Sequence, residues 1–238
     1  MLLGERYCKI LEKSLNRLGY DTIPIADNPY IERRVSAHAD LSLFFDGTTV
    51  FAADYLKTGD FCEKIKNSGI KISFIDVKQG EKYPDDCGMN ICPFGNRYIY
   101  NPKTAAQCLI EHLNRQGREG IECRQGYTRC SVCIVDSKSI ITADTLIAKN
   151  CRKMGLEVLE ILPGYIELDG FAYGFIGGTS INLEPELLAF TGTLELHPQQ
   201  DEILSFIESR GVEIEYLTRL PAFDIGSAHV IKTESQKE

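Results

Sequence analysis

Five glycines, each following an amphipathic helical stretch, constrain this chain more than any other feature. Gly19, Gly69, Gly117, Gly155 and Gly211 recur roughly every 50 residues, and each precedes a run typical of a β-strand. A helix, a glycine stop and a strand at a regular interval predict an array of similar supersecondary units.

A pair of short strands is expected between each helical unit and the next. The predicted pairs are residues 41–45 with 48–52, 90–94 with 97–100, 131–135 with 139–142, and 171–176 with 187–191. Each unit is therefore strand, strand, helix, strand. A doubly wound sheet would need single strands that alternate with helices, so the paired strands count against it.

The two ends of the chain each form an incomplete unit. The chain begins with a predicted helix over 3–18 and a strand over 20–25, and it ends with a predicted strand over 224–232 that lacks a helix. Joined in a circle, these pieces make a fifth unit and leave no exposed sheet edge. The sequence thus predicts an α/β fold in one domain, 1–238: a five-bladed pseudo-symmetric ββαβ propeller closed by N- and C-terminal pieces of one blade.

Composition limits the class of partner. A net charge of −8 and a pI near 5.2 argue against binding to nucleic acid or to an anionic membrane surface, and no run approaches the ~20 apolar residues of a membrane span. We expect a small-molecule ligand, with a cationic one fitting best, and a protein that is a monomer or a homodimer.

The nine cysteines indicate reduced thiols, because an odd number cannot pair completely. A cytoplasmic protein is therefore expected. Cys130 and Cys133 resemble a redox or zinc pair, but on a strand positions three apart face opposite sides. We therefore expect no metal site and no cofactor.

Two phrases carry a resemblance to a known family. Residues 173–179, Tyr-Gly-Phe-Ile-Gly-Gly-Thr, and residues 220–227, Leu-Pro-Ala-Phe-Asp-Ile-Gly-Ser, are similar to phrases of a bacterial branch of the pentein superfamily. The pentein fold is shared by guanidino-group-modifying enzymes: arginine and agmatine deiminases, dimethylarginine dimethylaminohydrolase and amidinotransferases. The resemblance implies a late cysteine nucleophile, a histidine with a nearby acid, and carboxylates that hold a guanidinium. This chain has no cysteine after Cys151 and offers Ser227 and His229 in the final blade instead.

Residues at the start of each unit's first strand are expected to converge near the ring's axis. Alignment of the units on their strand-to-strand turns brings together His38, Asp40, Cys87, Cys130 and Asp224. On a strand, the imidazole and carboxylate of His38-Ala-Asp40 would lie on the same side, where the acid could orient the ring.

These residue types fit chemistry on a guanidinium, which needs a thiolate to attack the central carbon, a histidine to move protons and acids to hold the cation. We assign the attack to Cys130, proton transfer to His38, and cation binding to Asp40 with Asp224; Cys87 is the reserve nucleophile. The structural alternative is that His38 and Asp40 tie a strand entrance and that Cys130 is a small residue in a crowded pore.

Gly177 and Gly178 leave two interpretations open. Their N–H groups could form a substrate-binding nest for an anion, or the pair could mark a bulge or a close backbone approach. For the whole chain, the first hypothesis is a hydrolase, deiminase or amidinotransferase-like enzyme acting on a guanidino or amidine compound. The alternative is a non-catalytic pentein that serves as a small-ligand sensor or a protein-interaction module.

Overall fold

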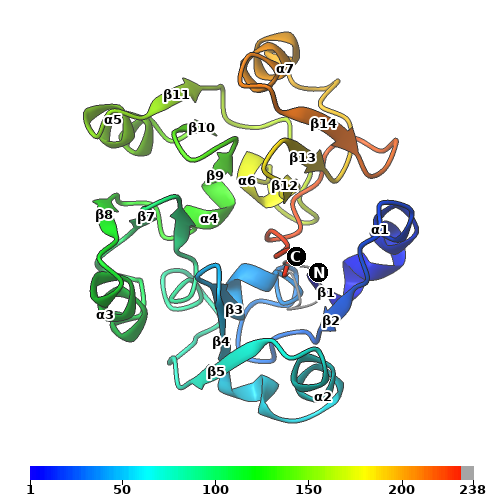
Figure 1. The fold of residues 1–238 in the computed structure, drawn as a ribbon, viewed down its shortest axis with the longest axis vertical. Helices are drawn as coiled ribbons and strands as arrows, with labels where there is room; N and C mark the ends of the chain where they lie inside the picture. Colours follow the sequence, from blue (N-terminus) through cyan, green and yellow to red (C-terminus); the bar gives the residue numbers. More distant parts are fainter. Residues whose placement is uncertain (232–238) are drawn as a thin grey trace.

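The computed structural model describes residues 1–231, which form five blades in a ring around a central axis (Figure 1). The longer helices lie on the outside of the ring, and the first strand of each complete blade lies nearest the centre. Residues 232–238, which include the end of the predicted domain and the last residue of the predicted C-terminal strand, lie outside the described part.

Four complete blades repeat one order of elements: two antiparallel strands, a helix, and a third strand parallel to the second. The second and third blades contain β3 (Leu43–Phe45), β4 (Thr49–Ala53), α2 (Asp60–Asn67) and β5 (Lys71–Ile75), then β6 (Cys92–Phe94), β7 (Arg97–Tyr100), α3 (Gln107–Arg115) and β8 (Glu119–Glu122). The fourth and fifth contain β9 (Val132–Ile134), β10 (Ser139–Thr142), α5 (Thr145–Lys153) and β11 (Glu157–Glu160), then β12 (Ser180–Glu184), β13 (Leu187–Phe190), α7 (Gln200–Glu208) and β14 (Glu213–Tyr216). This order is the predicted ββαβ unit.

The first blade is built from both ends of the chain. β1 (Leu2–Gly4) pairs in parallel with β2 (Ile23–Ile25), and α1 (Glu5–Arg17) connects the two strands. Leu2 also forms an antiparallel bridge with His229, with N···O distances of 2.8 and 3.0 Å. The predicted closure of the ring by N- and C-terminal pieces is therefore confirmed.

The five stop glycines all lie just after a helix and adopt the left-handed backbone conformation. Their φ angles run from 71° at Gly211 to 85° at Gly19. An L side chain is strained in this conformation, so glycine ends the helix at little cost. At the other end of α5, the Asp144 side chain accepts hydrogen bonds from the N–H groups of Leu146 and Ile147, as expected of an N-cap.

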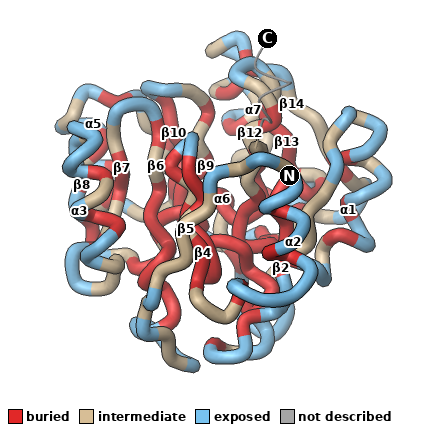
Figure 2. The backbone as a smooth tube through the Cα atoms, turned by 60° about the horizontal axis from the view of Figure 1, so that its bottom comes forward, coloured by how far each residue is buried: buried red, intermediate tan, exposed pale blue. Residues whose placement is uncertain are grey.

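The apolar core lies between neighbouring blades. Within residues 1–231, five clusters of buried apolar side chains each join two adjacent blades of the ring. In one of them, Cys133 and Ile141 of the fourth blade pack with Leu188 and Phe190 of the fifth. Figure 2 shows this burial along the inner strands, with exposed residues along the outer helices. The blades therefore depend on one another, because one blade alone cannot cover its apolar face.

Several predicted elements are wrong in detail. Short helical turns precede three first strands, namely η1 (Ala39–Leu41), α4 (Thr128–Ser131) and α6 (Ile176–Thr179), and η2 (Asp54–Lys57) precedes α2. Within the predicted strand 171–176, residues 171–175 form no strand and Ile176 begins α6; the first strand of this blade is β12 (Ser180–Glu184). At α6 the chain turns close to α4, since a Cβ on Gly177 would lie 2.5 Å from the carbonyl oxygens of Arg129 and Cys130.

The terminal assignments also change. The chain begins with β1, whereas a helix was predicted from residue 3, and the predicted strand 224–232 is reduced in its described part to the bridge at His229. Both differences arise because pairing with a segment distant in sequence decides where such short strands begin and end. Local sequence patterns do not record this pairing. None of the helices found in residues 1–231 has the length and apolar character needed to cross a bilayer.

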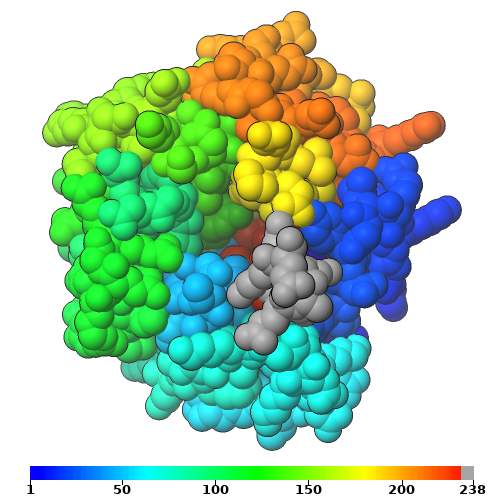
Figure 3. Space-filling view, in the orientation of Figure 1, coloured from blue at the N-terminus to red at the C-terminus, as the bar shows by residue number. Residues whose placement is uncertain are grey.

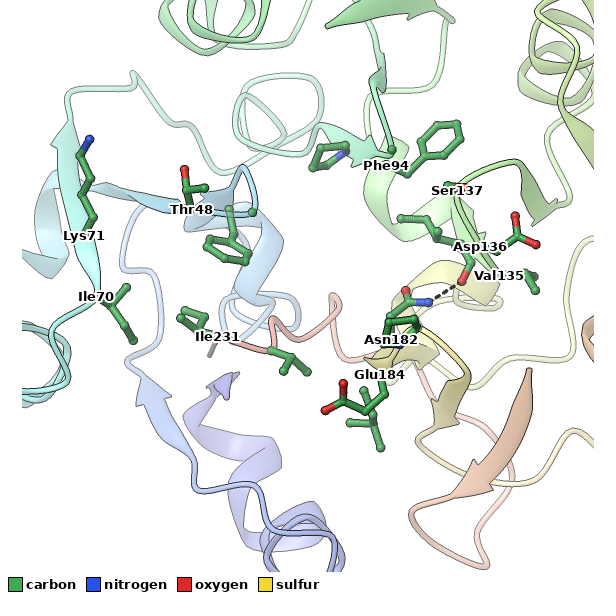
Figure 4. Close-up of a pocket in the computed structure, with 18 of the residues that line it drawn as sticks. Thr48, Ile70, Lys71, Phe94, Val135, Asp136, Ser137, Asn182, Glu184 and Ile231 are labelled. Atoms are coloured by element: carbon green, nitrogen blue, oxygen red, sulfur yellow. Dashed lines mark hydrogen bonds between the residues drawn. The ribbon is translucent and has the colours of Figure 1, made fainter. Parts of the chain in front are cut away.

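The ring has two mouths along its axis. At one mouth the hairpin turns of the blades surround a cavity of about 760 Å³, whose lining includes Thr48, Ser137 and Glu184 (Figure 4). The space-filling view in Figure 3 shows the molecule hollowed near its centre, where the blades meet. The loops that precede the first strands converge at the other mouth, where His38, Cys130 and Asp224 of the predicted site line a second cavity.

Candidate active site

His38 and Asp224 come from neighbouring blades and face each other. His38 Nδ1 lies 4.0 Å from Asp224 Oδ1, and both side chains are buried. Two backbone N–H groups hold the Asp224 carboxylate: that of Phe175 lies 2.9 Å from Oδ2, and that of Gly226 lies 2.8 Å from Oδ1. The backbone therefore fixes this carboxylate beside the imidazole.

Three glycines make these close approaches possible. A Cβ on Gly178 would lie 1.9 Å from Asp224 Oδ1, and one on Gly226 would lie 2.2 Å from the Cβ of His38. Gly177 packs against backbone carbonyl oxygens of α4. Gly177 and Gly178 are not among the described residues that line the cavity at this mouth, so the structure places them behind the site.

Asp40 and Cys130 form the second contact of the site. The Cys130 thiol donates to Asp40 Oδ2 at 2.8 Å, and the Ser227 hydroxyl donates to the same oxygen at 3.2 Å. The Asn90 side-chain amide donates to Cys130 Sγ at 3.4 Å. Asp40 lies in η1 and Cys130 in α4, so both are presented by helical turns and not by the strands that the sequence predicted.

The thiol, the imidazole and a carboxylate converge at one point. His38, Cys130 and Asp224 each place one ligating atom within 4.8 Å of the other two, and all three residues are buried. The same three atoms could hold a divalent metal such as zinc, which accepts nitrogen, sulfur and oxygen ligands. Cys133, by contrast, packs in the apolar cluster between two blades, so it does not share this environment.

Burial and nearby acids control the protonation of this centre. Burial, followed by the charges of Asp40 and Asp224, raises the pKa of the Cys130 thiol well above its usual value. Burial also raises the pKa of Asp40 to about 7, against the opposing hydrogen bond from Cys130. Burial lowers the pKa of His38, and the charge of Asp224 partly offsets this. Near neutral pH the thiol is therefore protonated and the imidazole is neutral.

The centre opens into a cavity of about 440 Å³. His38, Cys130 and Asp224 lie among the lining residues, together with the aromatic side chains of Tyr83, Tyr127, Phe171, Tyr173 and Phe175. Glu32, Glu81, Lys82 and Asp86 supply further charged groups. A site with an apolar aromatic wall and a few convergent polar groups is the usual form of a small-molecule pocket.

Two buried polar atoms of this centre have no hydrogen-bond partner in the described part of the chain. They are His38 Nε2 and Asp40 Oδ1. Buried polar atoms normally have partners, because an unmade hydrogen bond costs about 1–3 kcal/mol. Unpartnered atoms of this kind are compatible with a ligand that supplies the missing donors and acceptors.

Cys87 lies outside the centre. Its side chain is buried in a small apolar cluster with Ile31, Val35 and Leu41, and its thiol donates to the Pro84 carbonyl at 3.1 Å. Burial raises the pKa of Cys87 to about 11. Neither Cys87 nor Asp40 lines the cavity, but Asp40 contacts Cys130 directly. The structure therefore brings together four of the five residues expected at the axis, without Cys87.

Sequence reasoning missed the roles of Asn90, Tyr127 and Asp86. The side-chain amide of Asn90 makes two hydrogen bonds to α4: its Oδ1 accepts from the Arg129 N–H at 2.6 Å, and its Nδ2 donates to Cys130 Sγ. The Tyr127 hydroxyl donates to Asp86 Oδ2 at 2.6 Å on the cavity wall. Proximity to Cys130 in the chain was the only local signal for Tyr127, and Asn90 and Asp86 had none.

Solved structures of similar fold place this ring in a known class. They include dimethylarginine dimethylaminohydrolase (13% identity, covering 88% of this chain and 84% of that chain, TM-score 0.52), agmatine deiminase from C. jejuni with substrate bound (8%, 91% and 86%, 0.52), and inosamine-phosphate amidinotransferase from Streptomyces griseus (12%, 98% and 82%, 0.51). Identities this low show a shared fold alone. The ring of five ββαβ blades is the pentein fold, as the sequence resemblance implied.

Within that class, the chain belongs to one particular family. A family model described as a family of unknown function, DUF6873, matches residues 2–229. A comparison with curated proteins finds no matching relative.

Proposed function

We propose that this protein is an enzyme that modifies a guanidino or amidine compound, with Cys130 as its nucleophile. One observation carries the proposal: the Cys130 thiol, the His38 imidazole and the Asp224 carboxylate converge at an aromatic cavity, and the Cys130 thiol is hydrogen-bonded to Asp40. Dimethylarginine and agmatine, which appear in the names of two structures of similar fold, both contain a guanidino group.

The charges of the centre explain how a cation would activate the thiol. A thiolate beside two carboxylates is disfavoured, which, together with burial, is why the pKa of Cys130 is raised. A guanidinium bound at Asp224 beside Cys130 would compensate the negative charge of the centre and lower the pKa of the thiol. Asp40 does not line the cavity, so we assign the direct contact with the guanidinium to Asp224 and the hydrogen bond that holds the thiol to Asp40.

The proposed reaction has two steps. The Cys130 thiol proton passes to the neutral His38 imidazole, and Sγ forms a bond to the central carbon of the guanidinium. The C–N bond to the leaving group then breaks, and His38 returns the proton to the departing nitrogen as ammonia or an amine is released. Water or an amine next attacks the same carbon and displaces Sγ, which regenerates the thiol and completes a hydrolysis or an amidino transfer.

The test is a panel of guanidino and amidine compounds incubated with the protein at pH 7–8 in the presence of a chelator. Released ammonia or amine measures turnover, and intact-mass spectrometry measures a covalent adduct. We expect turnover or an adduct with wild type, neither with Cys130→Ser, and full activity in Cys108→Ser, whose cysteine is exposed. Absence of turnover, adduct and ligand-induced thermal stabilisation across the panel would refute the proposal.

A small-ligand sensor is the second candidate. The observation that favours it is the hydrogen bond from the Cys130 thiol to Asp40, because a thiol that keeps its proton is a poor nucleophile. A sensor would be stabilised by the same compounds without forming an adduct or releasing a product. The cavity also distinguishes both candidates from a protein-interaction module, which needs no lined void at the centre.

A further inference from the structure

Asp86 is a second carboxylate of the cavity with incomplete hydrogen bonding. The residue is 2% exposed and lines the cavity. Its Oδ2 accepts from the Tyr127 hydroxyl at 2.6 Å, whereas its Oδ1 is buried and has no partner among the residues that the structure describes. Asp86 also has no ion pair with a lysine, arginine or histidine in that part of the chain. A buried carboxylate of this kind lacks the compensation that buried charges normally have.

The other charged groups outside the centre are either paired or exposed to water. Glu32 forms an ion pair with Arg34, whose guanidinium lies over the Phe171 ring. Glu81 and Lys82 are adjacent in sequence, exposed and of opposite sign. Among the described residues that line the cavity, Asp86 is therefore the uncompensated charge beyond the His38–Cys130 centre.

One aromatic wall connects the two carboxylates. The backbone N–H of Phe175 holds Asp224, and the hydroxyl of Tyr127 holds Asp86. The two rings lie side by side, with centroids 6.3 Å apart, and Tyr83 continues the wall with its centroid 5.4 Å from that of Tyr127. Aromatic rings bury methylene groups and attract cations at their faces. An alkyl chain could therefore run along this wall from one carboxylate to the other.

We propose that Asp86 forms a second cation subsite and that the substrate is a guanidinoalkylamine, with its guanidinium at Asp224 and Cys130 and its ammonium at Asp86 Oδ1. This inference rests on the proposed function and specifies its substrate class. A substrate with a carboxylate tail fits poorly, because Lys82 is the only lysine or arginine among the described lining residues and it is exposed. The ammonium would supply the donor that Asp86 Oδ1 lacks.

Calorimetric titration of the Cys130→Ser variant with three probes of equal chain length tests the inference without turnover. The probes are guanidinobutylamine, with two positive charges, butylguanidine, with one, and guanidinobutanoate, with a carboxylate. We expect guanidinobutylamine to bind at least about tenfold more tightly than butylguanidine, because one hydrogen bond between charged groups has about that effect on affinity. Guanidinobutanoate should bind most weakly. Asp86→Asn, added to this variant, should weaken only guanidinobutylamine, by about tenfold. Glu195→Gln, which removes an exposed carboxylate outside the cavity lining, should change none of the three.

The outcomes separate this inference from the proposed function. Equal affinities for guanidinobutylamine and butylguanidine would overturn the Asp86 subsite while leaving the guanidinium site in place, and so would an equal loss for both probes in Asp86→Asn. Failure of all three probes to bind would overturn the guanidinium site and the subsite together. The comparison of the three probes decides the question even if Asp86→Asn does not fold.

Discussion

Replacing Asp40 by asparagine should make the protein more stable and inactive at the same time. Asp40 is buried, and burial raises its pKa from the ordinary 3.8 to about 7. In the folded protein the Asp40 carboxyl therefore ionises at a higher pH than it does in the unfolded chain. An asparagine side chain has nearly the same shape as aspartate and carries no charge, so the variant avoids the cost of a buried carboxylate.

The sign of the pH dependence follows from proton binding. Between about pH 4 and pH 7 the folded wild type retains a proton on Asp40 that the unfolded chain has lost, so its unfolding free energy falls as the pH rises. A pKa difference of this size corresponds to about 4 kcal/mol. In Asp40→Asn, the hydrogen bonds from Cys130 and Ser227 reach a neutral amide oxygen and are weaker than those to the carboxylate, by about 1 kcal/mol each, which offsets part of the gain in stability. The expected net gain for Asp40→Asn at pH 8 is therefore about 2 kcal/mol.

Urea unfolding of wild type and variant at pH 4, 6 and 8 measures this difference. We expect a gain that grows from pH 4 to pH 8, because only the wild type titrates at this position. Glu195→Gln, which removes an exposed carboxylate, serves as the control and should not alter the pH profile. Equal stability of wild type and Asp40→Asn at pH 8, or a difference independent of pH, would refute the electrostatic account of the site.

Two further predictions concern groups away from the centre. Burial tends to raise the pKa of Asp46, but hydrogen bonds from His112 and from the N–H groups of Thr48 and Thr49 outweigh it and hold the pKa below its ordinary value. The stability from this carboxylate is present above about pH 4 and is lost as the pH falls further. Asp46→Asn should therefore lower the unfolding free energy at pH 7 by about 2 kcal/mol and reduce the loss of stability below about pH 4. Urea unfolding between these pH values measures both effects. Asp144→Ala removes the N-cap of α5 and should cost about 1 kcal/mol at pH 7, measured by urea unfolding; no loss would contradict the capping geometry.

The candidate site was predictable only in part. His38, Asp40, Cys130 and Asp224 were expected to converge in the pore from two successive levels of the ring, and they do lie together. Strand alternation predicts this convergence, whereas Asp40 and Cys130 lie in helical turns before the strands. Cys87 was expected beside them because its blade aligns equally well, but its loop turns the thiol toward Pro84. Repeat alignment locates a level in the ring, and local backbone geometry decides which side chains reach the axis.

The sequence by itself determined the ring. Stop glycines, helical stripes and paired strands are local patterns, and the need to close sheet edges joins the two ends of the chain. Only the tertiary structure decided the chemistry of the cavity, since Asn90, Tyr127, Phe175 and Asp86 acquire their roles through contacts with residues distant in sequence. Their hydrogen bonds and charges depend on burial and on the approach of separate blades, which no pattern within a single segment records.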